Sequence, residues 1–524
     1  MKSIILLYNP PSAKEGEPWI TPIPLNLLSI CSLIDESKYD IKIIQDFPRI
    51  ALGKMIKQLP QAICLAISTM TGNQILNGLY VAKEIRKLKP ELPLIWGGYH
   101  PTALPEETLK NETVDIVIRG YGEIVFPKII DCLAKHQDIS DLPGLSFKKN
   151  GKIFHNQDGE VPDLNSLPIL PYHLFDVERF FKNTGSRTLH YISSRGCPHQ
   201  CGFCADFAVY KRRWNALSAS RVISDLEFLK KKYNFDAVRF YDSNIFVNEQ
   251  RTKEMCLGVL EKELNFQWLK CNADAFILAN YQDETLELMS KAGVNNILIG
   301  MESGYVPALE CISKKATIKE NIEAVRKLHK FNISIGFSFI FGFPYDLQAD
   351  KMEEEHLKEL KATMQAISDF SCEYIEGDYY LLFIFTPYPG VRLTQRYQKL
   401  GWVSPKSFQD WGKINLNTLC SPWISQKSLK IYEQCLKINW FLMHKLSRNV
   451  LRGAKSAYFK KIAIFVDNLA VNFLSKRIKQ GKLGLPIPLE AVKFYYSAKG
   501  RVQAAGAKIV FKNLYGKLFA RFAK

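Results

Sequence analysis

The sequence lacks any apolar run long enough to cross a membrane. The opening segment, MKSIILLYNP, has too short an apolar stretch for a secretory signal and no small-residue cleavage site. No internal repeat or low-complexity tract is visible. We therefore expect a folded protein that stays in the cytoplasm.

A disulfide framework is also lacking, although the chain contains 12 cysteines. Outside one cluster they are scattered without regular spacing, which is typical of reduced thiols inside a cell. The length of 524 residues predicts two or three domains. Hydrophobic residues at 47% and charged residues at 23% are those of an ordinary globular protein.

Acidic residues are scarce at one end of the chain. Residues 421–524 carry 21 Lys and Arg but only three Asp and Glu, so the whole net charge of +18 lies there. Strand signals stop after Trp423, and we expect a basic helical C-terminal region. A helical cap on the preceding domain is the favoured interpretation, and peripheral contact with the inner face of a membrane is the alternative. With the charge confined to one end and no RNA-binding module visible, nucleic acid is disfavoured as a partner.

Short apolar runs alternate with helical patterns over residues 1–140. This alternation predicts a doubly wound parallel sheet of the α/β class, in which ligands bind beyond the carboxyl ends of the strands. Ser68-Thr69, Gly97-Gly98 and Gly120-Tyr121-Gly122 fall at such ends. The expected strands are Ile4–Tyr8, Ile41–Ile44, Ala62–Ile67, Leu94–Trp96 and Ile116–Ile118.

Sequence punctuated by Pro and Gly indicates a linker over residues 141–186. The alternation then resumes over residues 187–420, where an open sheet and an incomplete β/α barrel both fit the pattern. The expected strands are Leu189–Ser193, Ala237–Tyr241, Trp268–Cys271, Ile297–Gly300, Ile335–Phe341 and Tyr379–Phe385.

Three cysteines, Cys197, Cys201 and Cys204, lie in a loop after the first of these strands. Their spacing is Cys-x3-Cys-x2-Cys. Three thiolates can bind three irons of a cubane cluster and leave the fourth iron open to another ligand. A zinc knuckle completed by His199 and three unrelated thiols are the alternatives, but zinc sites usually pair their cysteines and bring a second pair from elsewhere.

With Phe203 before its last cysteine, this loop resembles the signature of the radical S-adenosylmethionine superfamily. The resemblance implies a partial (βα)6 barrel of the TIM type and a [4Fe-4S] cluster on the three cysteines. S-adenosylmethionine would bind the open iron, and an external one-electron reductant would release a carbon radical from it. Phe203, Asp242 and Glu302 match segments that contact S-adenosylmethionine, although a helix cap or a surface ion pair also explains the two acids. Gly336 lies in a strand resembling the one that adenine approaches.

The strand ends of the first domain resemble those of the B12-binding (Rossmann-like) domain that precedes the barrel in one radical S-adenosylmethionine subfamily. Glycines there let a flat corrin lie against the backbone. The alternative is a sheet domain with ordinary glycine turns and no ligand. The resemblance implies that cobalamin contacts Ser68, Thr69, Gly97, Gly98, Gly120 and Gly122.

The chain lacks the Asp-x-His-x-x-Gly pattern of proteins that bind cobalt through histidine. We therefore expect His100 to make structural hydrogen bonds. If cobalamin binds, the resemblance implies that neither its own base nor a protein histidine lies on cobalt, and that Ser68, Thr69, Met70 and their neighbours face its lower side.

These resemblances imply a cobalamin-dependent C-methyltransferase that acts on an unactivated carbon of a small-molecule or lipid-like substrate. One S-adenosylmethionine would supply the methyl group and another the radical. A cyclase, oxidase or rearrangement enzyme, as in tetrapyrrole cyclases with the same domain order, fits the same features. A sensor that binds cluster and corrin without turnover is an alternative of another class, which the intact cysteine triad disfavours.

Overall fold

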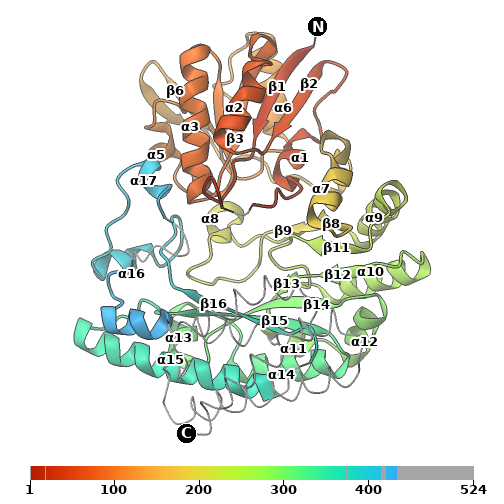
Figure 1. Ribbon diagram of the computed structural model, residues 1–524, viewed down its shortest axis with the longest axis vertical. Helices are drawn as coiled ribbons and strands as arrows, with labels where there is room; N and C mark the ends of the chain where they lie inside the picture. The colour runs from red at the N-terminus through yellow and green to blue at the C-terminus, as the bar shows by residue number, and fades with distance from the viewer. Residues whose placement is uncertain (1, 18, 373–374, 415–420, 434–524) are drawn as a thin grey trace, which may run out of the picture. The chain divides into compact units, whose positions relative to one another are not determined.

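The computed structural model describes residues 2–17, 19–372, 375–414 and 421–433 (Figure 1). The described residues up to Ser428 form one compact unit. The predicted basic helical region 421–524 lies mostly outside the described residues, so its fold stays a prediction. Within the described ranges, no helix combines the length and the apolar character needed to span a bilayer.

The N-terminal part of this unit is built on a seven-stranded sheet of order β2-β1-β3-β4-β5-β6-β7. The first five strands are parallel, as their apolar alternation with helices predicts. The strands are β1 Ser3–Tyr8, β2 Tyr39–Ile44, β3 Ala62–Ser68, β4 Leu94–Gly97, β5 Ile116–Ile118, β6 Leu145–Lys149 and β7 Lys152–His155.

Helices connect the parallel strands of this sheet. Leu27 of α1 and Phe126 of α6 are buried with Ile5 and Leu7 of β1 in one apolar core. Buried strands that read as continuous apolar runs are those that helices cover on both faces. The helices are α1 Leu25–Cys31, α2 Pro48–Ile56, η1 Leu59–Gln61, α3 Asn73–Leu88, α4 Tyr99–Ala103, α5 Pro105–Leu109 and α6 Val125–Ala134.

Strands β6 and β7 form an antiparallel hairpin that continues the sheet from β5. This hairpin lies inside the segment 141–186 that the sequence analysis assigned wholly to a linker, so the sheet extends further than expected. Asn150 and Gly151 make its turn, with φ angles of 52° and 75°. An Asn-Gly pair between apolar runs is a strong hairpin signal, because this turn requires positive φ at both residues.

The second part of the unit is a partial parallel barrel, as the family resemblance implies. Its strands form two sheets, β12-β11-β8 and β13-β14-β15-β16, which a bridge between Trp268 and Val294 joins. The strand predicted at residues 268–271 is interrupted at Lys270, whose φ is 53°. The strands are β8 Thr188–Tyr191, β11 Ala237–Phe240, β12 Gln267–Leu269, β13 Cys271–Ala273, β14 Asn296–Glu302, β15 Ser334–Phe341 and β16 Tyr379–Ile384.

Several helices of this part begin at side-chain caps. Ser218, Asn248 and Thr317 each accept a hydrogen bond from a backbone N–H in the first turn of the helix that follows. The helices are η2 Leu164–Ser166, η3 Tyr172–Leu174, α7 Val177–Thr184, α8 Asp206–Tyr210, α9 Ala219–Tyr233, α10 Glu249–Glu261, α11 Ala275–Asn280, α12 Asp283–Lys291, α13 Val306–Cys311, α14 Ile318–Lys330, α15 Ala349–Cys372, α16 Thr394–Lys399 and α17 Phe408–Trp411.

Helix α17 follows the barrel in the chain but packs against the N-terminal sheet domain. The ring of Phe408 lies 5.1 Å from Trp96, and the ring of Trp411 lies 5.5 Å from His100. In Figure 1, α17 lies close to α3 and α5, and it contacts α3. The polypeptide that leaves the barrel therefore ties the two halves of the unit together.

Candidate functional site

The three clustered cysteines lie in a loop that a short antiparallel pair closes, β9 Ser194–Arg195 with β10 Asn215–Ala216. Gly196 begins the loop with a φ of 76°, and a Cβ there would collide with the carbonyl oxygen of Arg213. Further along, the N–H of Gly202 donates to the carbonyl of Ile312 at 2.7 Å. The loop is thus fixed at its base and at its centre.

All three cysteines are free thiols and only partly accessible to solvent. Burial raises the pKa of Cys197 and Cys204, and it raises the pKa of Cys201 to about 11. Charge interactions with the neighbouring thiols also act to raise the pKa of Cys201 and Cys204. Deprotonating three such thiols requires a strongly cationic partner, which the irons of a cluster supply.

The described residues contain no three His, Cys, Asp or Glu side chains that converge on a single metal ion. A cubane cluster does not need such convergence, because each thiolate binds a different iron. His199 faces Asp274, with 3.7 Å between Nε2 and Oδ1. The donor set therefore fits an iron–sulfur cluster.

Asp242, at the end of β11, is fully buried and holds the start of the cluster loop. Its carboxylate accepts hydrogen bonds from the N–H and hydroxyl of Ser193, at 3.0 and 2.7 Å, and from the hydroxyl of Ser194 at 2.6 Å. These contacts make Asp242 a support of the loop. Its predicted contact with S-adenosylmethionine stays a prediction.

Glu302, at the end of β14, belongs to a buried charge cluster beside the cysteine loop. Lys314 Nζ lies 2.8 Å from Asp274 Oδ2 and 3.6 Å from Glu302 Oε1. Burial raises the pKa of Glu302, which Lys314 partly offsets. Burial favours the neutral form of Lys314, but Asp274 and Glu302 outweigh it and raise the pKa of Lys314. Lys314 therefore stays charged close to the cysteines.

The backbone of Glu302 has an unusual conformation that directs its side chain. Glu302 has a φ of 62°, which is rare outside glycine and often marks a functional site. A Cβ on Gly300 would collide with the Glu302 carboxylate, so the side chain folds back over that glycine. Glu302 is thus directed into the charge cluster, and its contact with S-adenosylmethionine remains a prediction.

Phe203 and Gly336 are two other residues predicted to lie near S-adenosylmethionine. Phe203 is partly buried in the cysteine loop. Gly336 of β15 is closely approached, but by the ring of Tyr379 from the neighbouring strand, with which a Cβ would collide. Glycine is therefore needed at position 336 because the Tyr379 ring packs there, whether or not a ligand binds.

The four glycines predicted to line a cobalamin site fall into two groups. At Gly97 and Gly120 the nearest atoms to an added Cβ lie 3.8 and 3.9 Å away, which leaves room beside the backbone. At Gly98 a Cβ would lie 2.7 Å from the carbonyl oxygen of Thr69, and at Gly122 it would lie 3.0 Å from Ile30. Gly97 and Gly120 thus fit close approach by a flat ligand, whereas Gly98 and Gly122 serve the protein's own packing.

In the loop after β3, one of the three residues predicted to face cobalamin is exposed to solvent. Met70 is 57% exposed, whereas Thr69 is buried and Ser68 accepts a hydrogen bond from Asn26 at 2.8 Å. His100 is buried and its Nδ1 lies 2.9 Å from the hydroxyl of Thr71, a hydrogen bond of the structural kind that the sequence predicts. Burial lowers the pKa of His100 to about 3.

Both glycine loops of the sheet domain contact the chain next to the cysteines. The Tyr99 hydroxyl donates to Asp206 Oδ1 at 2.7 Å, and the ring of Tyr121 lies 5.5 Å from Tyr210. Asp206 comes two residues after Cys204. The carboxyl edge of the sheet and the cysteine loop therefore meet.

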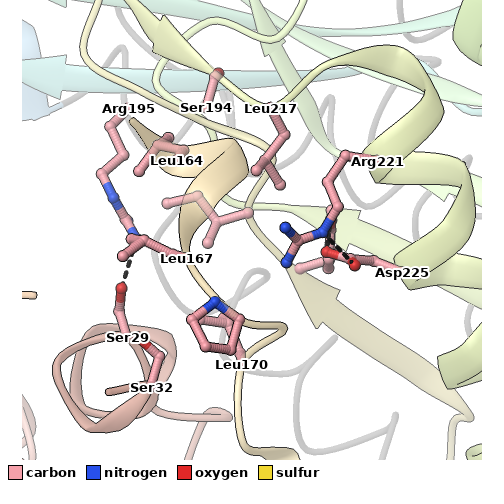
Figure 2. Close-up of a pocket in the computed structure, with 13 residues that line it drawn as sticks. Ser29, Ser32, Leu164, Leu167, Leu170, Ser194, Arg195, Leu217, Arg221 and Asp225 are labelled. Carbon is pink, nitrogen blue, oxygen red and sulfur yellow. Dashed lines mark hydrogen bonds and ion pairs between the residues drawn. The ribbon is translucent and has the colours of Figure 1, made fainter. Parts of the chain in front are cut away.

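A buried ion pair makes a second connection between the same two regions. Arg195 Nη2 lies 3.0 Å from Glu123 Oε1, and it donates to the hydroxyl of Ser29 at 2.6 Å. Figure 2 shows Arg195 reaching Ser29 of α1 beside Leu164 and Leu167, which precede the barrel in the chain. Residues from three segments of the sequence meet here.

Sequence reasoning missed Lys314, Asp274, Arg195 and Glu123 as members of this site. Arg195 and Glu123 lie within motifs that were recognised, and charged residues inside such motifs were the available signal. Lys314 follows α13 with no local pattern that marks it. Only the packing of the barrel brings it to the cysteine loop.

Residues 191–357 match the family model described as the Radical SAM superfamily, and residues 21–130 match the model of the B12 binding domain. A protein described as an uncharacterized methyltransferase, PH0819 of Pyrococcus horikoshii, is 28% identical over 92% of this chain and 98% of its own length. The anaerobic magnesium-protoporphyrin IX monomethyl ester cyclase of Synechocystis is 25% identical over 63% of this chain and 67% of its own. The hopanoid C-3 methylase of Methylococcus capsulatus is 22% identical over 70% and 67%.

Among solved structures, the chain resembles OxsB, described as a cobalamin-dependent S-adenosylmethionine radical enzyme with aqua-cobalamin bound. The TM-score is 0.67 at 18% identity, over 91% of this chain and 72% of that one. At this identity the likeness concerns the fold.

Residues 191–357 belong to the radical S-adenosylmethionine superfamily, which the cysteine loop and partial barrel define together with the family match. The protein is an enzyme that carries a B12-binding domain, residues 21–130, ahead of the barrel. The cofactors of these two domains are a [4Fe-4S] cluster, S-adenosylmethionine and cobalamin.

Proposed function

We propose that the protein is a cobalamin-dependent C-methyltransferase that acts on an unactivated carbon of a small-molecule or lipid-like substrate. The observation that carries this proposal is the contact between the glycine loops and the cysteine loop, made by Tyr99 with Asp206 and by Arg195 with Glu123. A cobalamin at the first loop and a cluster at the second would then serve one substrate. The match to a methyltransferase over nearly its whole length supports the same conclusion.

When bound, the cofactors supply a carbon radical that removes hydrogen and a methyl group that replaces it. The chain supplies the geometry. Cys197, Cys201 and Cys204 fix the cluster at the mouth of the barrel, where their partial burial limits access of water. Lys314 keeps a positive charge beside it, where it favours the thiolate forms. Gly97 and Gly120 leave their backbone accessible to a flat ring at the carboxyl edge of the sheet, which meets the cysteine loop.

An anaerobic assay of the reconstituted full-length protein tests this proposal. We expect S-adenosylhomocysteine and 5′-deoxyadenosine to form together when S-adenosylmethionine, cobalamin, a reductant and substrate are supplied. A methyl-deuterated S-adenosylmethionine would then transfer its label to the product. Turnover of substrate with 5′-deoxyadenosine but without S-adenosylhomocysteine would contradict methyl transfer.

Cyclisation, oxidation or rearrangement on the same scaffold is the second candidate function. The 25% identity to a tetrapyrrole cyclase favours it. Product formation without a labelled methyl group would select this candidate. A sensor role predicts no 5′-deoxyadenosine at all under reducing conditions.

Peripheral membrane contact through residues 421–524 is a separate hypothesis, which the concentration of positive charge in that segment supports. Cosedimentation with anionic vesicles tests it, with a variant that lacks residues 450–524 as the comparison. Equal cosedimentation of both proteins would remove the hypothesis. The external one-electron reductant is likewise a proposal, which reduction of the cluster by a flavodoxin or ferredoxin would test.

A further inference from the structure

In the first barrel strands, some side chains face the surrounding helices and the others face the concave inside of the barrel. Tyr191 of β8 and Phe240 of β11 face the helices, since the Tyr191 hydroxyl donates to Asp225 of α9 at 2.9 Å and the two rings lie 5.9 Å apart. Successive residues of a strand point to opposite faces. His190 and Arg239, which are paired in register between these strands, therefore lie on the concave face of the barrel.

Lys270 joins Arg239 on this concave face because the strand between Trp268 and Cys271 is irregular. The ring of Trp268 lies 4.8 Å from that of Phe240, which faces the helices. Cys271 is fully buried and paired in register with the equally buried Ile297 of β14, so both Trp268 and Cys271 face the helices. The left-handed φ of Lys270 places an extra residue between them and turns it to the other side. A left-handed lysine is uncommon and marks a position that the fold determines strongly.

Arg239 and Lys270 have no carboxylate to neutralise them among the described residues. The guanidinium of Arg239 lies 4.5 Å from the ring centre of Tyr241, and neither cation makes an ion pair or a hydrogen bond with a described residue. By contrast, the buried cation Lys314 of the same barrel meets Asp274.

The charge of Arg239 disfavours a further positive charge on its neighbours. Burial and the charge of Arg239 lower the pKa of Lys270, and the same two causes lower the pKa of His190 to about 3. The ring of His190 lies 4.8 Å from Tyr241, and its buried Nδ1 has no hydrogen-bond partner among the described residues. An unpaired cationic surface of this kind is stabilised when a ligand brings an anion.

The opposite strands give the concave face an apolar side. Phe337 and Phe339 of β15 stack on Phe370 of α15, so the residues between and beyond them, Ser338 and Ile340, face the concavity. The same alternation, together with partial burial, places further apolar side chains there. They are Leu298 of β14 and Leu381 and Phe383 of β16.

We propose that this concave face recognises a substrate with an apolar carbon skeleton and an oxyanion, either a carboxylate or a phosphate. Arg239 and Lys270 bind the oxyanion, while Leu298, Ile340, Leu381 and Phe383 contact the skeleton. Holding the substrate by both parts fixes which carbon is presented at the mouth of the barrel. The inference rests on the proposed function and names the substrate class of that site.

Binding of simple amphiphiles to the reconstituted full-length protein tests this inference. Decyl phosphate and decanoate are the charged probes, decanol is the uncharged one, and equilibrium dialysis below micellar concentrations measures their affinities. We expect at least one charged probe to bind about tenfold or more tightly than decanol, since a hydrogen bond to a charged group contributes about 1.5–3 kcal/mol. Equal binding of all three would overturn the inference.

Substitutions assign the effect to the two cations. We expect Arg239→Gln and Lys270→Gln each to weaken binding of the charged probe about tenfold, and Arg239→Lys to weaken it less. The control is Arg49→Gln, at an exposed residue of α2. Unchanged binding in both glutamine variants would contradict the proposal.

The cations could instead bind the carboxylate of S-adenosylmethionine, and the same variants distinguish the two sources. Loss of S-adenosylmethionine binding with retained binding of the charged probe would overturn the inference. Formation of 5′-deoxyadenosine by the wild-type protein is measured separately. If no 5′-deoxyadenosine forms but the probes bind as expected, the proposed function is wrong and the anion site is supported. If 5′-deoxyadenosine forms but the probes do not bind as expected, only the anion site is wrong.

Discussion

Arg195 and Glu123 form a buried ion pair that joins the cysteine loop to the sheet domain. The side chains are 12% and 5% exposed, with 3.0 Å between Nη2 and Oε1. Arg195 comes two residues before Cys197, and Glu123 follows the second glycine loop. Ser29 donates to Glu123 at 2.7 Å and accepts from Arg195, so its hydroxyl links the two charged side chains.

Breaking this pair from one side is expected to destabilise the protein strongly. Glu123→Gln leaves the Arg195 charge buried without its counter-ion, at a cost of about 3–5 kcal/mol. Urea denaturation of the cofactor-free protein measures the loss. The matched control is Asp35→Asn, which removes an exposed pair with Lys38 and should leave the midpoint unchanged. A Glu123→Gln midpoint equal to that of wild type would refute the role given to the pair.

Neighbouring glycines of the β4 loop should respond differently to the same substitution. Gly98→Ala forces a Cβ to 2.7 Å from the Thr69 carbonyl at a φ of 97°, and we expect a loss of about 1–3 kcal/mol in stability. Gly97→Ala meets nothing nearer than 3.8 Å and should fold normally.

Cobalamin binding separates the two glycines further. If a corrin lies against Gly97, the added methyl group of Gly97→Ala should weaken cobalamin binding about tenfold or more, measured by dialysis against hydroxocobalamin. A stable Gly97→Ala protein that binds cobalamin like wild type would show that the corrin does not approach this residue.

His100 should make stability depend on pH below neutrality. Burial lowers its pKa from 6.5 to about 3 in the folded protein, so between these values the unfolded chain binds a proton that the folded chain does not. Stability is therefore fully present above pH 6.5 and falls as the pH is lowered, by up to about 1.4 kcal/mol per pH unit.

The variant His100→Gln isolates this contribution. Urea midpoints between pH 5 and pH 7.5 should show a shallower pH dependence than in wild type, whatever the change in stability at neutral pH. His136→Gln, at an exposed position, is the control and should keep the wild-type slope. An unchanged slope in His100→Gln would mean that this histidine is not held neutral by burial.

Local pattern predicted most of the fold. The strand expected at Ile116–Ile118 has those bounds, and the others differ by a few residues at their ends, because a strand's limits depend on pairing partners that are distant in sequence. The hairpin β6–β7 was missed although Asn150-Gly151 gave a local signal for it. The break at Lys270 carried no signal, since a left-handed lysine is not encoded by residue type.

The candidate site was predictable only where its residues are close in sequence. Cys197, Cys201 and Cys204 lie in one loop, and their spacing together with Phe203 carried the resemblance from which a cluster is predicted. Lys314 and Arg239 depend instead on how separate strands curve into one barrel. Asp242 was singled out as a contact of S-adenosylmethionine, which stays a prediction, and its hydrogen bonds to Ser193 and Ser194 could not be read from the sequence.

Formation of 5′-deoxyadenosine tests the central claim, which is that the three-cysteine loop holds a cluster that starts a radical reaction. Wild-type protein reconstituted without oxygen and reduced with dithionite should convert S-adenosylmethionine to 5′-deoxyadenosine. Cys201→Ala should bind less iron and form none, while Cys132→Ala, at a partly buried cysteine of α6, should match wild type. Equal amounts from Cys201→Ala and wild type, or none from wild-type protein that carries a full cluster, would contradict the claim.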